Sequence, residues 1–200
     1  MSLSERVQRM KITAASESLK VAGSVASLNR KWWMPQGGGA ASPQFTMIRY
    51  YPYYFQSWKV IAPKTLGRTV KVILSSGVNG MSRSVGPATE WPASEELEVD
   101  GEEVISPRTS EAEAKQLARE YIEKFVMRRY RPSRTSNIEQ EKFELIFVPY
   151  YVYASEGQPL HKATLIEGFT GAVGKVKDVL PLMHSIVGEE VVTRRQEKVE

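Results

Sequence analysis

Residues 49–55 read RYYPYYF, and residues 146–152 read IFVPYYV. Each Pro-Tyr-Tyr is followed by an apolar segment, a polar turn, a second β-rich run and a short turn that ends in Gly80 or Gly171. The stretch between the proline and the glycine is longer in the first copy than in the second. This pattern predicts a duplicated module of a helix and a β-hairpin, with the longer hairpin in the first copy.

The strongest helix signal lies in the second half of the chain. Ser110 and Glu113 form a capping box, in which the two side chains satisfy main-chain amides at the start of a helix. Apolar residues then recur at three- and four-residue spacing up to Phe125, and Pro132 ends the run. The sequence therefore predicts a helix from about Ser110 to Arg129.

Strands are predicted around each Pro-Tyr-Tyr. Phe143, Leu145 and Phe147 alternate with their neighbours in the way that is typical of a half-buried strand. Each proline removes a main-chain donor, which predicts a sheet edge or a bulge at that point. A helix over about residues 13–29 is expected to precede the first hairpin, and another helix is expected to follow Asp178.

These elements predict an α+β fold of two related helix-plus-antiparallel-sheet units in a pseudo-symmetric arrangement. The expected segments are a first helix/hairpin repeat (1–87), an acidic, proline-containing linker (88–109), a second helix/hairpin repeat (110–188) and a polar tail (189–200). Units of this size bury a modest fraction of their surface, so the two halves are expected to share an interface.

The composition limits the chemistry that is open to the chain. Cysteine is absent, which excludes disulfides, thiolate chemistry and cysteine-ligated zinc. The two histidines are not at metal-ligand spacing, and no nucleophile lies at a recognisable spacing from a base. We therefore expect no metal, no cofactor and no enzymatic activity. The enzyme alternative would need a carboxylate pair such as Glu139 with Glu167.

The helix with spaced Ala114 and Ala118, the hairpin, and the closing segment IEGFTG (166–171) resemble the PepSY and related cystatin-like domains. In that family the last strand commonly closes with Val-Asp-Ala-x-Thr-Gly. The resemblance is strongest over residues 110–176, and a tandem arrangement would extend it over residues 13–86. It implies a non-catalytic, often extracytoplasmic module that binds or restrains protein partners.

The tyrosine clusters have three interpretations. They are a core that joins the halves, a surface for a protein or peptide partner, or a stacking platform for nucleobases beside a basic groove. In the second interpretation the two clusters lie near each other at a free sheet edge and bind a partner's strand, including that of a second copy in a homodimer. The candidate partner-binding residues are Tyr50, Tyr53, Tyr54, Trp58, Tyr150, Tyr151 and Tyr153.

Charge favours a second class of partner. Residues 1–87 contain 12 lysines and arginines against two glutamates, whereas residues 88–114 contain one arginine against nine acids. The acidic stretch can neutralise the first repeat within the chain, and the alternative is a single-stranded nucleic-acid-binding protein that uses the basic, tyrosine-rich first repeat. The candidate basic patch consists of Arg49, Arg68, Arg128, Arg129, Arg131 and Arg134.

No run of eighteen apolar residues occurs, so no membrane span is expected. Residues 1–5 (MSLSE) lack the apolar centre of a signal peptide. The chain as it stands is expected in the cytoplasm, and an extracytoplasmic location is expected if a signal or anchor was removed.

Overall fold

A computed structural model describes residues 9–16, 22–27, 43–179, 182 and 186. The strands are β1 (Arg9–Ala15), β2 (Gln44–Pro63), β3 (Thr69–Asn79), β4 (Val85–Pro87), β5 (Ser94–Asp100), β6 (Asn137–Ala154), β7 (Thr164–Glu167) and β8 (Val173–Lys175). The helical elements include α2 (Glu111–Tyr130) and the 3-10 turns η1 (Thr65–Gly67), η2 (Gly101–Glu103), η3 (Leu160–Lys162) and η4 (Val176–Asp178).

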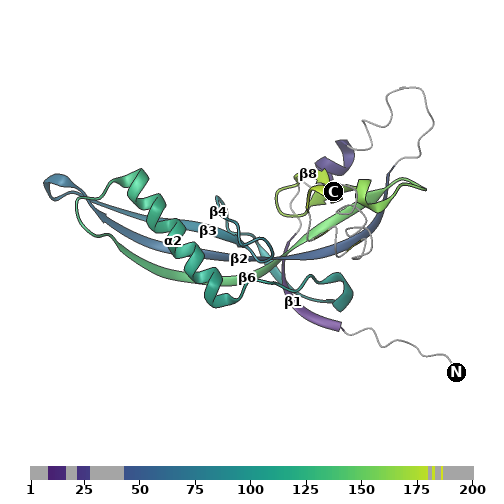
Figure 1. The fold of residues 1–200 in the computed structure, drawn as a ribbon, viewed down its shortest axis with the longest axis horizontal. Helices are drawn as coiled ribbons and strands as arrows, with labels where there is room; N and C mark the ends of the chain where they lie inside the picture. Colours follow the sequence, from purple (N-terminus) through teal and green to yellow (C-terminus); the bar gives the residue numbers. More distant parts are fainter. Residues whose placement is uncertain (1–8, 17–21, 28–42, 180–181, 183–185, 187–200) are drawn as a thin grey trace, which may run out of the picture. The chain divides into compact units, whose positions relative to one another are not determined.

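The described strands form one eight-stranded sheet in the order β4-β3-β2-β6-β1-β5, with β7 paired to β6 and β8 paired to β7 (Figure 1). The sheet is mixed, because β1 is antiparallel to β5 but parallel to β6 at Ala14 and Phe147. The prediction of two helix-plus-antiparallel-sheet units is therefore wrong: the fold is dominated by a single mixed sheet. The physical reason is that residues 9–15 and 94–100, which were expected outside the sheet, are strands.

The chain divides into two compact units, which are described separately. Unit 1 comprises residues 1–51, 94–105 and 147–200, and unit 2 comprises residues 52–93 and 106–146. The long strands β2 and β6 each contribute residues to both units.

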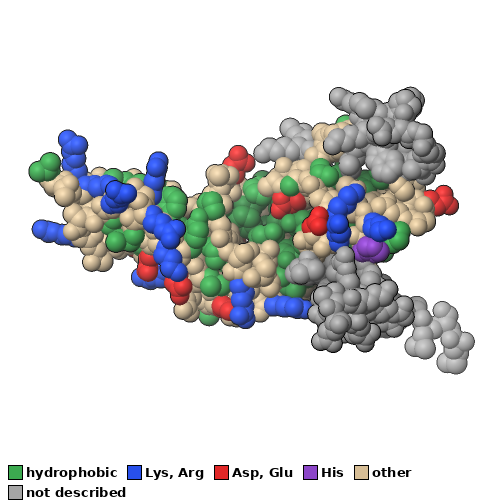
Figure 2. Space-filling model, turned by 45° about the horizontal axis from the view of Figure 1, so that its top comes forward, with side chains coloured by type: hydrophobic (Ala, Val, Ile, Leu, Met, Phe, Trp, Pro, Cys, Tyr) green, Lys and Arg blue, Asp and Glu red, His purple; other side chains and the backbone are tan. Residues whose placement is uncertain are grey.

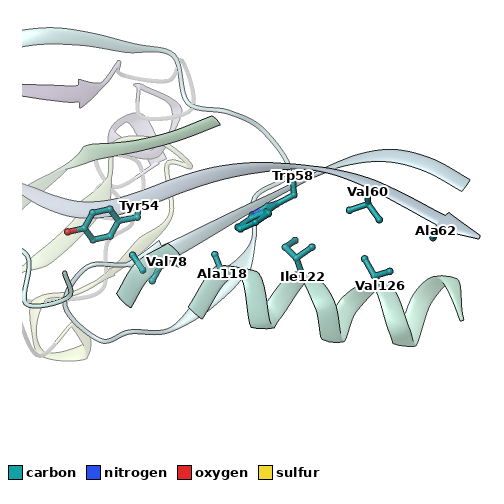
Figure 3. Packing of buried hydrophobic residues seen from close by; sticks show 9 residues of the cluster. Tyr54, Trp58, Val60, Ala62, Val78, Ala118, Ile122 and Val126 are labelled. Atoms are coloured by element: carbon teal, nitrogen blue, oxygen red, sulfur yellow. The ribbon is translucent and has the colours of Figure 1, made fainter. Parts of the chain in front are cut away.

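Unit 2 is a sheet covered on one face by α2 (Figure 1). The helix presents Ala114, Ala118, Ile122 and Val126 at four-residue spacing, and all four are buried. They pack against Trp58, Val60 and Ala62 of β2 and Val78 of β3 (Figure 3). The two alanines have no exposed surface, so the first half of the helix lies close to the strands.

The predicted helix in the second half of the chain is confirmed. Ser110 is the N-cap, and its side chain accepts a hydrogen bond from Glu113 N at 3.3 Å. Arg131 ends the helix in the left-handed conformation with φ 44°, one residue before Pro132. The local sequence signals therefore placed both ends of α2 to within two residues.

Unit 1 contains the β1–β5 ladder and the strands β7 and β8. β1 pairs with β5 along its whole length, from Arg9 opposite Asp100 to Ala15 opposite Ser94. The alternation of Met10, Ile12 and Ala14 with polar residues suits this strand. Residues 22–27 are helical. Of the rest of the helix expected over 13–29, residues 13–15 belong to β1, Ser16 follows that strand without regular structure, and the other residues lie outside the described ones.

Two meanders share one register. The first meander (residues 52–87) consists of the second part of β2 with β3 and β4, and the second meander (residues 149–175) consists of the end of β6 with β7 and β8. Residues 76–78 pair with residues 85–87 in the first, and residues 164–166 pair with residues 173–175 in the second.

The turns before β4 and β8 also correspond. Each contains the same two main-chain hydrogen bonds. In the turn before β4 these are Asn79 N to Ser84 O (2.9 Å) and Arg83 N to Asn79 O (3.1 Å). In the turn before β8 they are Glu167 N to Ala172 O (2.9 Å) and Gly171 N to Glu167 O (2.9 Å). Arg83 and Gly171 occupy the same position, and both have positive φ. The glycine that corresponds to Gly80 is therefore Gly168, not Gly171 as the sequence suggested.

These two glycines allow a close approach to the two prolines. Gly80 N donates to Pro52 O at 2.9 Å, and Gly168 N donates to Pro149 O at 2.7 Å. A Cβ atom on Gly168 would lie 2.5 Å from Pro149 Cγ, and one on Gly80 would lie 3.0 Å from Pro52 Cγ. A side-chain carbon would therefore collide with Pro149 at Gly168, and would be tight against Pro52 at Gly80.

Each helix contacts the other meander from the one that the sequence predicted. α2, which was expected on the second hairpin, packs on the first. The helical residues 22–27, which were expected on the first hairpin, contact the second through a hydrogen bond from Ser24 Oγ to Gly171 O (2.7 Å). The helix expected after Asp178 lies mainly outside the described residues, as does the tail from residue 189.

Candidate docking edge

The structure buries four of the seven candidate partner-binding side chains. Tyr50, Tyr54, Trp58 and Tyr150 are each less than a tenth exposed, whereas Tyr53, Tyr151 and Tyr153 are half-buried. Strand alternation accounts for this, because every second residue of a strand faces the core. These four side chains are therefore core residues of their own units.

The tyrosines contact one another and other rings inside each unit. In unit 1 the rings of Tyr51, the residue before Pro52, and Tyr150 lie 5.5 Å apart. In unit 2 the Tyr54 ring stacks on Phe143 at 5.6 Å, and its hydroxyl donates to Thr109 O at 2.8 Å. Burial raises the pKa of the Tyr54 phenol, and the negative charge of Glu111 adds to the effect.

The prolines do not leave the free edge that the sequence suggested. The carbonyl oxygens of Pro52 and Pro149 accept hydrogen bonds from Gly80 and Gly168. Beyond these points the strands continue in register, with Tyr53 opposite Asn79 and Tyr150 opposite Glu167. The partner-binding hypothesis therefore needs a different edge.

The first part of β3 is an open edge in unit 2. β4 covers residues 76–78 of β3, and Ala88 N donates to Ser75 O at 3.0 Å. No described strand pairs with residues 69–74 on the side away from β2. We call residues 69–74 the β3 edge.

The direction of the main-chain groups follows from Ser75. Its carbonyl points away from β2, and directions alternate along a strand, so the amides and carbonyls of Thr69, Lys71 and Ile73 also point away from β2. Their side chains are exposed, and Ile73 is 64% exposed. Val70, Val72 and Leu74 point to the opposite face and pack on the core beneath α2.

The second meander lacks this edge. The residue equivalent to Ser75 is Ala163, whose carbonyl accepts a hydrogen bond from Val176 N (3.2 Å). Just before Ala163 the chain forms the 3-10 turn η3 instead of continuing as a strand. The β3 edge is thus what the first meander has in addition to the shared fold.

Five of the six candidate basic residues belong to unit 2. Arg128 and Arg129 are in the last turn of α2, and Arg131 and Arg134 lie in the loop between α2 and β6. Arg68 lies in the loop between β2 and β3. The loops are joined because Ser133 N donates to Pro63 O at 2.9 Å. Figure 2 shows Lys and Arg side chains gathered at this end.

These basic side chains are not neutralised within the described part of the chain. None of the five forms an ion pair with a described acid. Lys64 adds a further cation at the hairpin tip. Leu66, between Lys64 and Arg68 in the sequence, is 95% exposed and has a φ of 63°. Arg49, by contrast, lies in unit 1 and donates to Ile48 O at 3.0 Å.

A pocket of about 510 Å³ lies between α2 and residues 132–138 of the same unit. Its carboxylate, Glu123, is 3.0 Å from Arg119 Nε, and Ser136 Oγ is buried there without a hydrogen-bond partner. Among the described residues no group of three or more His, Cys, Asp or Glu side chains has the geometry of a metal site.

The carboxylates of the enzyme alternative are engaged separately. Glu139 Oε1 accepts from Asn137 Nδ2 at 2.7 Å, and Glu167 Oε1 accepts from the Tyr150 hydroxyl at 3.3 Å. Glu167 also accepts from the hydroxyl of Thr170. Both carboxylates thus hold local structure, Glu139 at the start of β6 and Glu167 at the turn before β8.

Within the described residues, no helix is both long and apolar enough to cross a membrane. Comparison of the chain with protein-family models, with curated proteins and with solved structures finds no match.

Proposed function

We propose that this protein is a non-catalytic binding module that captures an extended protein segment by adding it as a strand to the β3 edge. The observation that carries the proposal is the row of outward main-chain groups on Thr69, Lys71 and Ile73, to which no described strand pairs. Strand addition is a common way for sheets to recognise peptides, because the main chain supplies affinity and alternate side chains supply specificity. The role agrees with the one implied by the PepSY-like resemblance, that of a module that binds or restrains protein partners.

The charge of the edge selects the partner. Residues 64–80 contain Lys64, Arg68 and Lys71 and no acid. A captured segment therefore carries acidic residues, because opposite charges on facing strands are favourable and like charges are not. Ile73 gives the same surface an apolar contact.

The experiment is a selection of peptides from a random library on the immobilised protein, followed by binding to variants. Ile73→Pro removes the amide that points away from β2, so no hydrogen bond to β2 is lost. Proline is tolerated at such an edge position of a strand. Ile73→Ala keeps the amide and is the matched control.

We expect selected peptides to be acidic and to bind Ile73→Pro at least about tenfold more weakly than Ile73→Ala, since one hydrogen bond contributes about 0.5–1.5 kcal/mol and its loss leaves an acceptor unpaired. Bound peptide should also slow hydrogen exchange of the Lys71 and Ile73 amides. Equal binding to both variants would refute strand addition at this edge.

A second function is favoured by the basic end of unit 2. Lys64 and Arg68 flank the exposed Leu66 in the hairpin tip, and the loop with Arg131 and Arg134 is joined to this hairpin by the Ser133–Pro63 hydrogen bond. We propose that this end binds the phosphates of single-stranded nucleic acid. Binding of a fluorescent oligonucleotide should weaken steeply with salt, and the salt slope should fall by about one for each arginine replaced by alanine. Undetectable binding at low salt would end this proposal.

A further inference from the structure

We infer that the strand captured at the β3 edge is β5 of a second copy of this chain, so that copies associate head to tail. This inference rests on the proposed function of the β3 edge and names its occupant.

β5 is a strand with an open side in unit 1. It pairs with β1 along all seven of its residues, and no described strand pairs with its opposite side. It is seven residues long, against six in the β3 edge. The remaining ends of the sheet, β4 and β8, are strands of only three residues. Among the described residues, β5 in unit 1 and the β3 edge in unit 2 are thus two segments that each have an open side.

The charges of these edges are complementary. β5 contains Glu95, Glu96, Glu98 and Asp100 and no cation. Glu98 and Asp100 stand opposite Lys11 and Arg9 of β1.

Glu95 and Glu96 have no such counterpart. They are exposed and stand opposite Ala14 and Thr13. The negative charge at the start of β5 is thus not balanced across the ladder. It suits the β3 edge, where Arg68 and Lys71 are free of described acids.

The same charges disfavour pairing of like edges. Two β3 edges would bring Lys71 and Arg68 of one copy against the same cations of the other, and two β5 strands would bring acids against acids. The contact is therefore heterologous, with β3 of one copy against β5 of the next. A heterologous contact does not saturate in a dimer, so it builds rings or open chains of copies.

Sedimentation velocity of the full chain tests the inference. The wild-type protein should form species above 22.5 kDa that grow with concentration and dissociate as salt is raised. Ile73→Pro blocks the accepting edge, and the pair Glu95→Lys with Glu96→Lys blocks the inserting strand. Circular dichroism establishes that each variant is folded.

Head-to-tail association makes a specific prediction for the mixture. Each variant alone should be monomeric, because it lacks one of the two surfaces. An equimolar mixture should form dimers of twice the chain mass and nothing larger, because the Ile73→Pro copy inserts its intact β5 into the intact β3 edge of the other. Ile73→Ala should assemble like the wild type. A synthetic peptide of residues 94–100 should dissolve wild-type assemblies without any substitution.

A wild-type chain that stays monomeric at all concentrations, or a mixture that does not dimerise, would overturn the inference. Failure of the proposed function has a different signature. If library peptides bind the wild type and not Ile73→Pro while copies do not associate, the edge binds a foreign segment and only the second-copy inference fails. If neither peptides nor copies bind in an Ile73→Pro-sensitive way, both fail.

Discussion

Replacing Gly168 with alanine tests the close packing that both meanders share. The added Cβ would lie 2.5 Å from Pro149 Cγ and 2.8 Å from Pro149 O. The proline ring cannot rotate away, and the oxygen belongs to the main chain that accepts the Gly168 N hydrogen bond at 2.7 Å. The substitution must therefore separate the two strands at this point.

The magnitude follows from these two losses. Forcing a methyl into a packed position costs about 1–3 kcal/mol, and weakening the hydrogen bond adds about 1 kcal/mol, so we expect the free energy of unfolding to fall by about 2–4 kcal/mol. Gly80→Ala meets Pro52 at 3.0 Å and should cost about 1–2 kcal/mol, because a shift of a few tenths of an ångström relieves it. Gly174→Ala is the matched control in β8, since nothing lies within 4 Å of its Cβ.

Urea unfolding followed by circular dichroism measures the effect. For a slope of about 2 kcal/mol per molar, Gly168→Ala should lower the urea midpoint by about 1–2 M. Gly174→Ala should change stability by no more than about 0.5 kcal/mol. The reasoning is refuted if Gly168→Ala is as stable as Gly174→Ala, or if Gly80→Ala is the more damaging of the two proline-facing substitutions.

Two further predictions concern unit 2. Ile122→Ala truncates a side chain that is 1% exposed and should lower the free energy of unfolding, measured in urea, by about 2–5 kcal/mol. Met127→Ala, at a side chain that is 61% exposed, should lower it far less. Similar losses of stability in the two variants would contradict the placement of α2. The raised pKa of Tyr54 means that the folded state holds the phenolic proton above pH 10, where the unfolded state has released it. Stability should therefore fall as pH rises past the usual phenol pKa of 10.0, and less so in Tyr54→Phe; an unchanged slope in that variant would argue against a buried phenol.

The sequence was sufficient for elements whose signals are local. A capping box, a 3.6-residue period and a terminal proline placed α2, and alternation around Pro149 placed the middle of β6. The Pro-Tyr-Tyr repeat located both meanders, although it matched Gly80 to the wrong glycine. Gly171 ends a Thr-Gly turn, but Gly168 is the glycine that approaches Pro149 as Gly80 approaches Pro52, and only the structure shows this contact.

β1 and β5 were missed although each carries a strand pattern. In β5, Leu97 and Val99 alternate with glutamates, but four acids in seven residues favoured a solvated linker. The opposite charges that balance part of this strand lie about ninety positions away in β1, at Lys11 and Arg9. A single sequence gives no sign that two such distant segments pair.

The pairing of helices with meanders was also beyond the sequence. Periodicity shows that α2 has an apolar face, but it does not show which sheet that face covers. Which sheet α2 covers depends on how closely the helix and the strands can pack. Ala114 and Ala118 allow the helix to approach Trp58 and Val78 closely in unit 2.

Comparison of the two meanders also shows which segment the first meander has and the second lacks. They share their turns, their register and their proline-to-glycine contact, so these features suffice to make the module. The second meander does without any counterpart of residues 69–74. In the first meander this extension exposes Ile73 and leaves main-chain groups open on one side, which in a sheet is a liability for unwanted pairing. The same segment also pairs with β2 and packs Val70, Val72 and Leu74 beneath α2, so one face of it supports the core of unit 2 while its outer side is the edge that we propose binds a partner strand.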